Sequence, residues 1–192
     1  MKIVSFSSSI AVAAKLVKEK PKLPSPDEQQ TLALFDEFRL PLLRYLRSLG
    51  LAAVDAEEVV QEVFLALFQH LQAGKNRENL SGWLFRVAHN IGLKRRKKNS
   101  DLNRRMIANP HGFLEKQLHP SDDPEQDLAN NRRQQRLLSV VRALPERERN
   151  CLFLRAEGLN YREIAKVLDV SVGTVSQSLA RSIGRLTAAD LK

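Results

Sequence analysis

The sequence predicts an all-α protein made of two small helical domains joined by a flexible linker. Apolar residues recur every three or four positions through most of the chain, which is the period of a helix, and no segment shows a convincing strand pattern. Aromatic residues make up 6% of the chain and hydrophobic residues 43%, a composition that favours helices over a β-sandwich. With 192 residues, the chain is long enough for two domains that each bury a core.

An N-terminal extension is expected over residues 1–26. Three prolines stand within residues 21–26, and they cannot all lie inside a helix. The apolar run before them is broken by serines and follows a single lysine, so we expect an extension rather than an export signal, and a cytoplasmic protein. No stretch approaches the roughly eighteen apolar residues that span a membrane, so we expect no membrane protein.

The first helical domain is expected over residues 27–99. Its first helix, residues 27–49, stops before Gly50 and gathers its large apolar side chains on one side: Leu34, Phe35, Phe38, Leu42, Leu46 and Leu49. A second helix follows at residues 55–71. A third is expected at residues 79–98, with Asn79 or Ser81 as its N-terminal cap.

The helix expected at residues 55–71 separates an apolar side from an acidic side. At 100° per residue, one side gathers Val60, Val63, Phe64, Leu67 and Leu71. The opposite side carries acidic and amide groups around one leucine: Asp55, Glu58, Gln61, Glu62, Leu65 and Gln69. The pattern fits either a solvated charged face or a protein interface centred on Leu65. In an otherwise basic chain, an acidic face favours a basic protein partner over DNA.

The helix expected at residues 79–98 ends in a basic run. Its buried side is predicted to hold Leu80, Leu84, Val87 and Ile91, and its open side Phe85, Arg86, His89, Asn90 and Arg96. The five consecutive cations of residues 94–98 are expected to attract phosphates. Trp83 is either a core residue or an aromatic side chain that stacks on an exposed base.

A flexible acidic linker is expected over residues 100–127, where helical periodicity is lost while prolines and carboxylates gather. The second domain is expected over residues 128–192. It begins with helices at residues 128–144 and 145–157, and a helix-turn-helix follows over residues 160–181.

Two helical periods separated by a three-residue turn indicate this helix-turn-helix. Ile164, Ala165 and Leu168 give the first helix an apolar face, and Asp169-Val170-Ser171 supplies the turn and the next N-terminal cap. The second helix is expected to bury Val172, Val175 and Leu179 and to expose Thr174, Gln177, Ser178 and Arg181. In such a unit the second helix normally enters the DNA major groove. An ordinary helical hairpin in a core is the alternative.

The charge balance favours a polyanionic partner, with nucleic acid first. Lys and Arg number 31 against 22 Asp and Glu, a net charge of +9. Cys151 is the single cysteine and lies in an apolar helical run, so we expect a buried structural thiol. The four histidines are scattered, and no catalytic or metal-ligating cluster is evident. We therefore expect no enzyme, no metal or cofactor and no small-molecule substrate.

Three segments, in the same order along the chain, resemble one family. Residues 55–68 resemble region 2.2 of bacterial RNA polymerase sigma factors, and residues 81–90 (Ser-Gly-Trp-Leu-Phe-Arg-Val-Ala-His-Asn) resemble regions 2.3 and 2.4. Residues 143–185 resemble region 4. The short chain, with only a tether between its domains, looks like the extracytoplasmic-function (ECF) subfamily. The resemblance covers about residues 28–98 and 130–188.

The resemblance implies binding surfaces for core RNA polymerase and for promoter DNA. Region 2.2 of the family docks on the β′ clamp helices, which maps here to Asp55, Glu58, Gln61, Glu62 and Leu65. The minus-ten element is melted and held by regions 2.3 and 2.4, which map to Trp83, Arg86, Asn90, Lys94, Arg95, Arg96 and Lys97. Region 4 reads the minus-thirty-five element and meets the β flap, which maps to Thr174, Ser176, Gln177, Ser178, Arg181 and Arg185. An anti-sigma protein is a further implied partner.

The chain departs from the family in its expected recognition helix. Ser176 and Ser178 stand where basic residues are common. Base readout is therefore expected to rely on Gln177 and Arg181, with Thr174 as a third candidate, and minus-thirty-five recognition is expected to be weaker or altered. Two rival functions remain. A conventional helix-turn-helix repressor or activator leaves the acidic face around Leu65 unexplained, and a DNA-targeted enzyme lacks a catalytic constellation.

Overall fold

The computed structural model describes residues 25–105 and 124–190, and within these ranges the chain is helical and contains no strand. The predicted all-α class is therefore confirmed. Most of the expected N-terminal extension and the centre of the expected linker lie outside the described residues. None of the described helices combines the length and apolar character that a membrane crossing requires.

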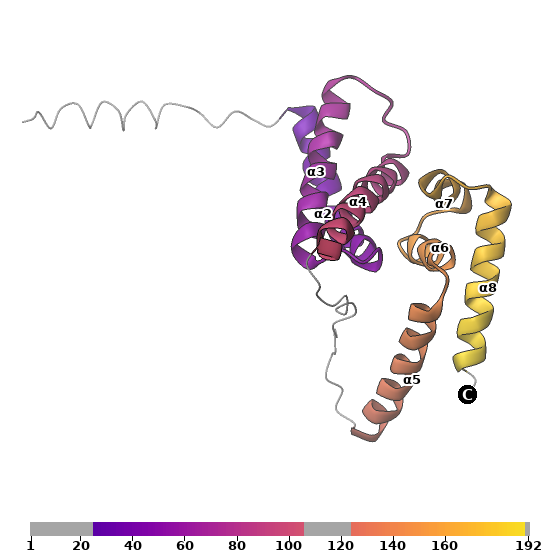
Figure 1. Cartoon of the computed structure of the whole chain (residues 1–192). Coiled ribbons are helices and arrows are strands. Elements are labelled where there is room, and N and C mark those ends of the chain that lie inside the picture. The colour runs from indigo at the N-terminus through magenta and orange to yellow at the C-terminus, as the bar shows by residue number, and fades with distance from the viewer. Residues whose placement is uncertain (1–24, 106–123, 191–192) are drawn as a thin grey trace, which may run out of the picture.

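Three helices form what we call the N-terminal group: α2 (Pro26–Ser48), α3 (Ala53–Gln72) and α4 (Leu80–Arg105). Figure 1 shows α4 crossing the α2–α3 pair. The side chain of Asn79 caps α4, because its Oδ1 accepts a hydrogen bond from the backbone N–H of Gly82 at 3.0 Å.

Four helices form the C-terminal group: α5 (Pro124–Ala143), α6 (Glu146–Ala156), α7 (Tyr161–Leu168) and α8 (Val172–Asp190). α4 and α5 both extend into the segment expected to be a linker, and α8 runs beyond the expected end of the helix-turn-helix. Figure 1 shows α5 alongside the C-terminal half of α8 and α7 next to α4.

Local capping explains why the helix-turn-helix forms where the sequence predicts it. Asn160 and Glu163 make a reciprocal capping box at the start of α7. Asp169 ends α7 in the left-handed conformation, with φ of 53°, which a short polar residue tolerates better than a β-branched one. Ser171 Oγ then accepts a hydrogen bond from Thr174 N at 3.1 Å and caps α8.

The apolar face predicted for α3 is confirmed as core, because all five of its side chains are buried. The face predicted for the first helix is confirmed in part: Leu42, Leu46 and the capping Leu49 are buried, whereas Leu34, Phe35 and Phe38 are half-buried and pack against the core. The two groups share one continuous cluster of buried residues, which also includes Ile164, Val175 and Leu179 of the helix-turn-helix. The sequence predicted the two sets of helices but gave no sign that they pack against each other.

The predicted faces of α4 and α8 need correction. Phe85 and His89 were expected on the open side of α4, but both are buried, because their rings pack against Phe38 and Tyr45 of α2. Ser178 was expected to face outward from α8 but is buried, because α8 packs against α6 in addition to α7 and needs a wider inner face. Val172 was expected in the core but lies exposed at the first position of α8.

Two ion pairs join the groups across a long sequence separation. The guanidinium of Arg44 on α2 donates to both carboxylate oxygens of Glu157, at 2.8 and 2.6 Å. Arg96 on α4 lies 2.7 Å from Glu146 at the start of α6, and also donates to the backbone oxygen of Leu49 at 3.1 Å. These pairs hold α6 against the N-terminal group.

The corrected position of Phe85 generates a stability prediction. Its ring is fully buried and packs edge-to-face on Phe38 and Tyr45. We expect Phe85→Ala to lower the free energy of unfolding by about 3–5 kcal/mol, since it leaves a cavity in the core. Arg86→Ala, at the exposed neighbouring position, is the matched control and is expected to change stability by less than about 0.5 kcal/mol in urea unfolding. Equal effects of the two substitutions would contradict the packing.

Candidate protein and nucleic-acid interfaces

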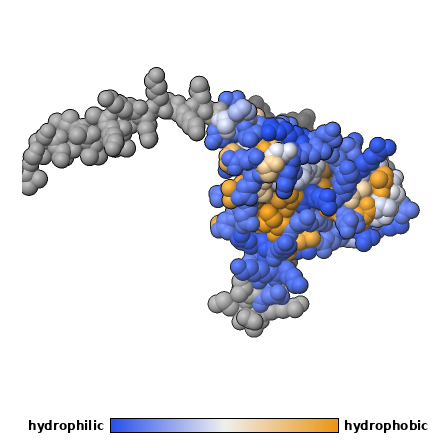
Figure 2. All heavy atoms as spheres, turned by 90° about the horizontal axis from the view of Figure 1, so that it is seen from above, coloured by the Kyte–Doolittle hydropathy of each residue, from blue (hydrophilic) through white to orange (hydrophobic). Residues whose placement is uncertain are grey.

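The acidic face of α3, which we define as Asp55, Glu58, Gln61, Glu62 and Leu65, lies at the surface as predicted. Glu58, Gln61 and Glu62 are exposed, and Asp55 is half-buried. Leu65 has 59% of its surface exposed, on a helix whose other side is core. Figure 2 shows hydrophobic side chains surfacing among hydrophilic ones on one side of the molecule. An exposed leucine next to several carboxylates is suited to a partner that offers both apolar and cationic groups.

Arg95 of α4 covers part of this acidic face. Its guanidinium lies 2.5 Å from Glu58 Oε2 and 2.6 Å from Glu62 Oε1, and 3.6 Å from Asp55 Oδ1. Asn99, one turn further along α4, donates to Asp55 Oδ2 at 2.8 Å. We call Arg95 and its three carboxylates the Arg95 cluster. The hydrogen bond to Glu58 raises the pKa of Arg95 above its ordinary value, so the guanidinium stays charged.

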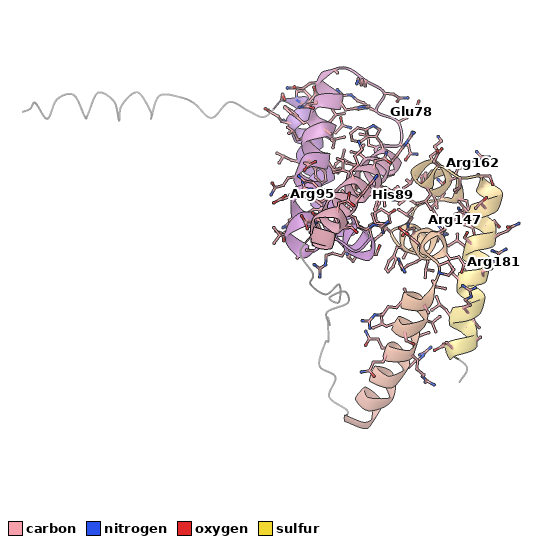
Figure 3. The ribbon with its side chains drawn as sticks, in the orientation of Figure 1. Glu78, His89, Arg95, Arg147, Arg162 and Arg181 are labelled. Carbon is pink, nitrogen blue, oxygen red and sulfur yellow. The ribbon has the colours of Figure 1, made fainter. Side chains whose placement is uncertain are left out.

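The other residues predicted to bind DNA on α4 divide into free and engaged side chains. Those exposed to solvent are Arg86, Asn90, Lys94 and Lys97. Arg96, by contrast, is half-buried and paired with Glu146. Figure 3 shows Arg95 on the α3 side of α4 and His89 on the side that faces the C-terminal group. The basic run is therefore split between intramolecular ion pairs and an open cationic surface.

Trp83 lies at the edge of the core rather than inside it. It is half-buried, and its ring contacts that of His70, with centroids 4.8 Å apart and planes at 46°. His70 is held in place from the other side, because its Nε2 lies 2.8 Å from the backbone oxygen of Asn76. The structure is therefore compatible with both hypotheses for Trp83, a core residue or a base-stacking residue. One part of its ring packs against the protein, and the rest is accessible to solvent.

On α8, the predicted DNA-contacting residues are only partly displayed. Ser176, Gln177 and Arg181 are exposed, and Figure 3 labels Arg181 on the outer part of the helix. Thr174 is half-buried, and its hydroxyl lies 2.9 Å from that of Ser171.

The remaining two predicted residues of α8 make contacts with α6. Ser178 is buried close to Cys151, and burial raises the pKa of the Cys151 thiol while Ser178 acts in the opposite direction. Arg185 lies 2.5 Å from the buried carboxylate of Glu148. Cys151 is fully buried, which confirms the expected structural thiol.

The sequence did not predict one buried polar pair, formed by Tyr45 and His89. The Tyr45 hydroxyl and His89 Nδ1 lie 2.8 Å apart in the buried region where α2 and α4 meet the C-terminal group. Burial lowers the pKa of His89, and nearby Arg96 acts in the same direction against the opposing effect of Glu146. Burial also raises the pKa of Tyr45. Neither residue carries a sequence signal, because the contact depends on how α2 and α4 pack.

Within the described ranges, no three His, Cys, Asp or Glu side chains are arranged to hold a metal ion. The structure instead presents a capped helix-turn-helix, a cationic surface on α4 and an acidic face on α3. This combination defines a helical nucleic-acid-binding protein of the helix-turn-helix class.

Family models match both helical groups. Residues 34–101 match Sigma-70 region 2, and residues 134–186 match Sigma-70, region 4. The chain therefore belongs to the sigma-70 family, in its extracytoplasmic-function (ECF) group, and is an RNA polymerase sigma factor that directs promoter-specific initiation of transcription.

Relatives with this description cover most of the chain. The ECF RNA polymerase sigma-E factor of Escherichia coli K12 is 29% identical over 159 residues, which are 76% of this chain and 82% of the relative. The sigma-E factor of Haemophilus influenzae is 27% identical over 135 residues, 67% of this chain and 70% of the relative.

Two solved structures share the fold. One is the sigma factor RpoE in complex with the anti-sigma factor NepR from Bartonella quintana, with a TM-score of 0.58 and 23% identity over 82% of this chain and 96% of that one. The other is CnrH in complex with the cytosolic domain of CnrY, with a TM-score of 0.54 and 22% identity over 93% of this chain and 94% of that one.

The buried position of His89 predicts that the stability of the protein depends on pH. A histidine whose pKa is lowered by folding contributes stability above its unfolded value of about 6.5, and that contribution is lost as pH falls through its folded pKa. We expect the melting temperature of the wild type to fall between about pH 7.5 and pH 5, and His89→Gln to show a smaller fall over the same range. A fall of the same size in His89→Gln and in the wild type would contradict this role of His89.

Proposed function

We propose that the acidic face of α3 binds core RNA polymerase, while exposed residues of α4 and α8 bind the two promoter elements. The observation that carries this proposal is the exposed Leu65 beside the carboxylates of Glu58 and Glu62, on a helix inside the segment that matches sigma region 2. The acidic face of α3 carries a charge opposite to that of the chain as a whole. DNA is therefore a poor ligand for this face, and a basic protein surface is a good one.

The α4 surface is suited to the minus-ten element. Lys94, Lys97 and Arg86 are exposed cations that attract backbone phosphates, and Asn90 offers an amide next to them. The accessible part of Trp83 supplies a surface on which an unpaired base can stack. Strand opening at this site needs no catalytic residue, because stacking and phosphate contacts with the protein replace the stacking lost from the duplex. We accordingly propose no enzymatic activity.

The N-terminal half of α8 is suited to the minus-thirty-five element. Gln177 and Arg181 are the exposed side chains able to address adenine and guanine edges, and Ser176 beside them is able to bond to either. Burial of Ser178 removes it from this surface. Arg185 contributes only if it leaves Glu148. The base-reading surface on α8 is therefore small. We expect a large share of the promoter affinity to come from α4 and from the polymerase.

The two groups have to separate when both promoter elements are held. Elements centred about 25 base pairs apart lie about 85 Å apart along B-form DNA. α8, with 19 residues, is only about 28 Å long, and the two groups share a continuous core. The ion pairs that join them, Arg44–Glu157 and Arg96–Glu146, each include a partner at least partly exposed to water, so they present a modest barrier to separation.

We further propose that an anti-sigma protein restrains the chain and that the protein works in the cytoplasm with the polymerase. The fold similarity to a sigma factor solved with the anti-sigma factor NepR supports the first proposal. The similarity to sigma-E factors of other bacteria supports the second.

Leu65 allows a closely matched test of the polymerase interface. Leu65→Ala removes the apolar centre of the acidic face, and we expect it to weaken binding to core polymerase about tenfold. Leu40 on α2 has the same exposed fraction, 59%, and lies outside this face. Leu40→Ala is therefore the control and should leave the affinity within about twofold. Titration of labelled protein with purified core polymerase measures both, and equal affinities for the two variants would contradict the interface.

Arg181 tests base readout by α8. We expect Arg181→Ala to weaken binding to promoter DNA by about 1–3 kcal/mol, since a bidentate contact to guanine is lost. Binding to random DNA of the same length should fall far less, because it depends on phosphate contacts. The measurement is competition between the two DNAs for the polymerase complex. Equal losses on promoter and random DNA would exclude Arg181 from base readout.

A further inference from the structure

Arg95 stands in the basic run of α4, yet its side chain is turned away from the open cationic surface. One η nitrogen lies 2.5 Å from Glu58 Oε2 and the other 2.6 Å from Glu62 Oε1. These two carboxylates are one turn apart on α3, so a single planar guanidinium bridges them. A residue in a DNA-binding run thus occupies the surface that we propose for polymerase.

The Arg95 cluster shows which ligand the acidic face accepts. The three carboxylates carry a charge of −3, and Arg95 reduces the sum to −2. The cluster therefore already binds a guanidinium, the group that a basic partner helix presents. Arg95 bonds one oxygen of each glutamate, and its positive charge opposes the approach of a partner arginine, so the two compete for the acidic face.

We propose that Arg95 exchanges partners when polymerase binds. In the free chain it occupies Glu58 and Glu62; a basic side chain of polymerase displaces it, and the released guanidinium joins Lys94 and Lys97 at the promoter phosphates. This inference rests on the proposed polymerase interface. It makes Arg95 a positioning residue that links the two binding events.

Solvent exposure makes the exchange feasible. About half of each glutamate side chain is open to water, 52% for Glu58 and 48% for Glu62, and Arg95 itself is 24% exposed. The exposed glutamates let salt screen these ion pairs, unlike fully buried pairs that are costly to break. The arginine side chain is long and flexible, so the exchange requires rotamer changes and leaves the α4 backbone in place.

A permanent staple between α3 and α4 is the alternative role for Arg95. The two roles predict changes of opposite sign in the affinity for polymerase when Arg95 is removed. If Arg95 is a staple, its removal loosens the α3–α4 pair and weakens binding to polymerase and to DNA together. If Arg95 exchanges partners, its removal frees the carboxylates for polymerase but deprives the promoter of a cation, so the two affinities move in opposite directions.

The test uses the full chain, purified core polymerase and a forked minus-ten DNA. For Arg95→Gln we expect about fivefold tighter binding to core, with the difference shrinking at high salt, and about fivefold weaker binding of the DNA at saturating core. Lys98→Gln makes the same charge change at an exposed position outside the cluster, and should leave core affinity within about twofold. Equal or weaker core binding by Arg95→Gln would overturn the proposal.

A second variant protects the test against misfolding. Arg95→Lys keeps the charge but loses the planar fork that bridges both glutamates, so we expect core affinity between those of wild type and Arg95→Gln, and nearly unchanged DNA binding. Weaker core binding by Arg95→Lys than by wild type would favour the staple. If Leu65→Ala leaves core affinity unchanged, the α3 interface itself is wrong, an outcome distinct from a loss in Leu65→Ala without the expected gain in the Arg95 variants.

Discussion

The packing of α4 against α2, α3 and α7 is the constraint on which the rest of the structure depends. α2 and α4 approach so closely at Gly92 that an added Cβ would lie 2.8 Å from Leu46 Cδ2. This approach buries Phe85 and His89, directs Arg95 to α3 and leaves Lys94 and Lys97 in solvent. One helix thereby builds the core, borders the acidic face of α3 and presents the cationic surface.

The same helix brings the sigma region 2 and region 4 segments together. Its contacts with α7 and the Arg96–Glu146 pair place the helix-turn-helix against the N-terminal group. A protein that holds two promoter elements about 85 Å apart has to give up this arrangement. Release of Arg95 breaks partly exposed ion pairs, which respond to salt, whereas separation of the groups breaks such pairs and also exposes apolar residues of the shared cluster.

Local features account for what the sequence predicted well. The amphipathic pattern of α3 identifies its buried and exposed sides, and the residues that cap α7 and α8 define the helix-turn-helix, because both signals lie within a few neighbouring residues. The errors arose where a helix contacts several others: a periodicity analysis assumes one buried side, whereas α4 and α8 each have more. For this reason Ser178 was expected to face outward, and the contact of Arg95 with α3 was not predicted. Their actual neighbours, Cys151 and Glu62, are distant along the chain, and no pattern in the sequence joins them.

Run-off transcription is the most direct test of the central claim that this chain acts as a sigma factor through the α3, α4 and α8 surfaces. Core polymerase from the same organism, supplied with a pool of genomic promoter fragments, is expected to yield discrete transcripts only when the folded chain is added. A chain that binds the same fragments but yields no promoter-dependent transcript would contradict the account.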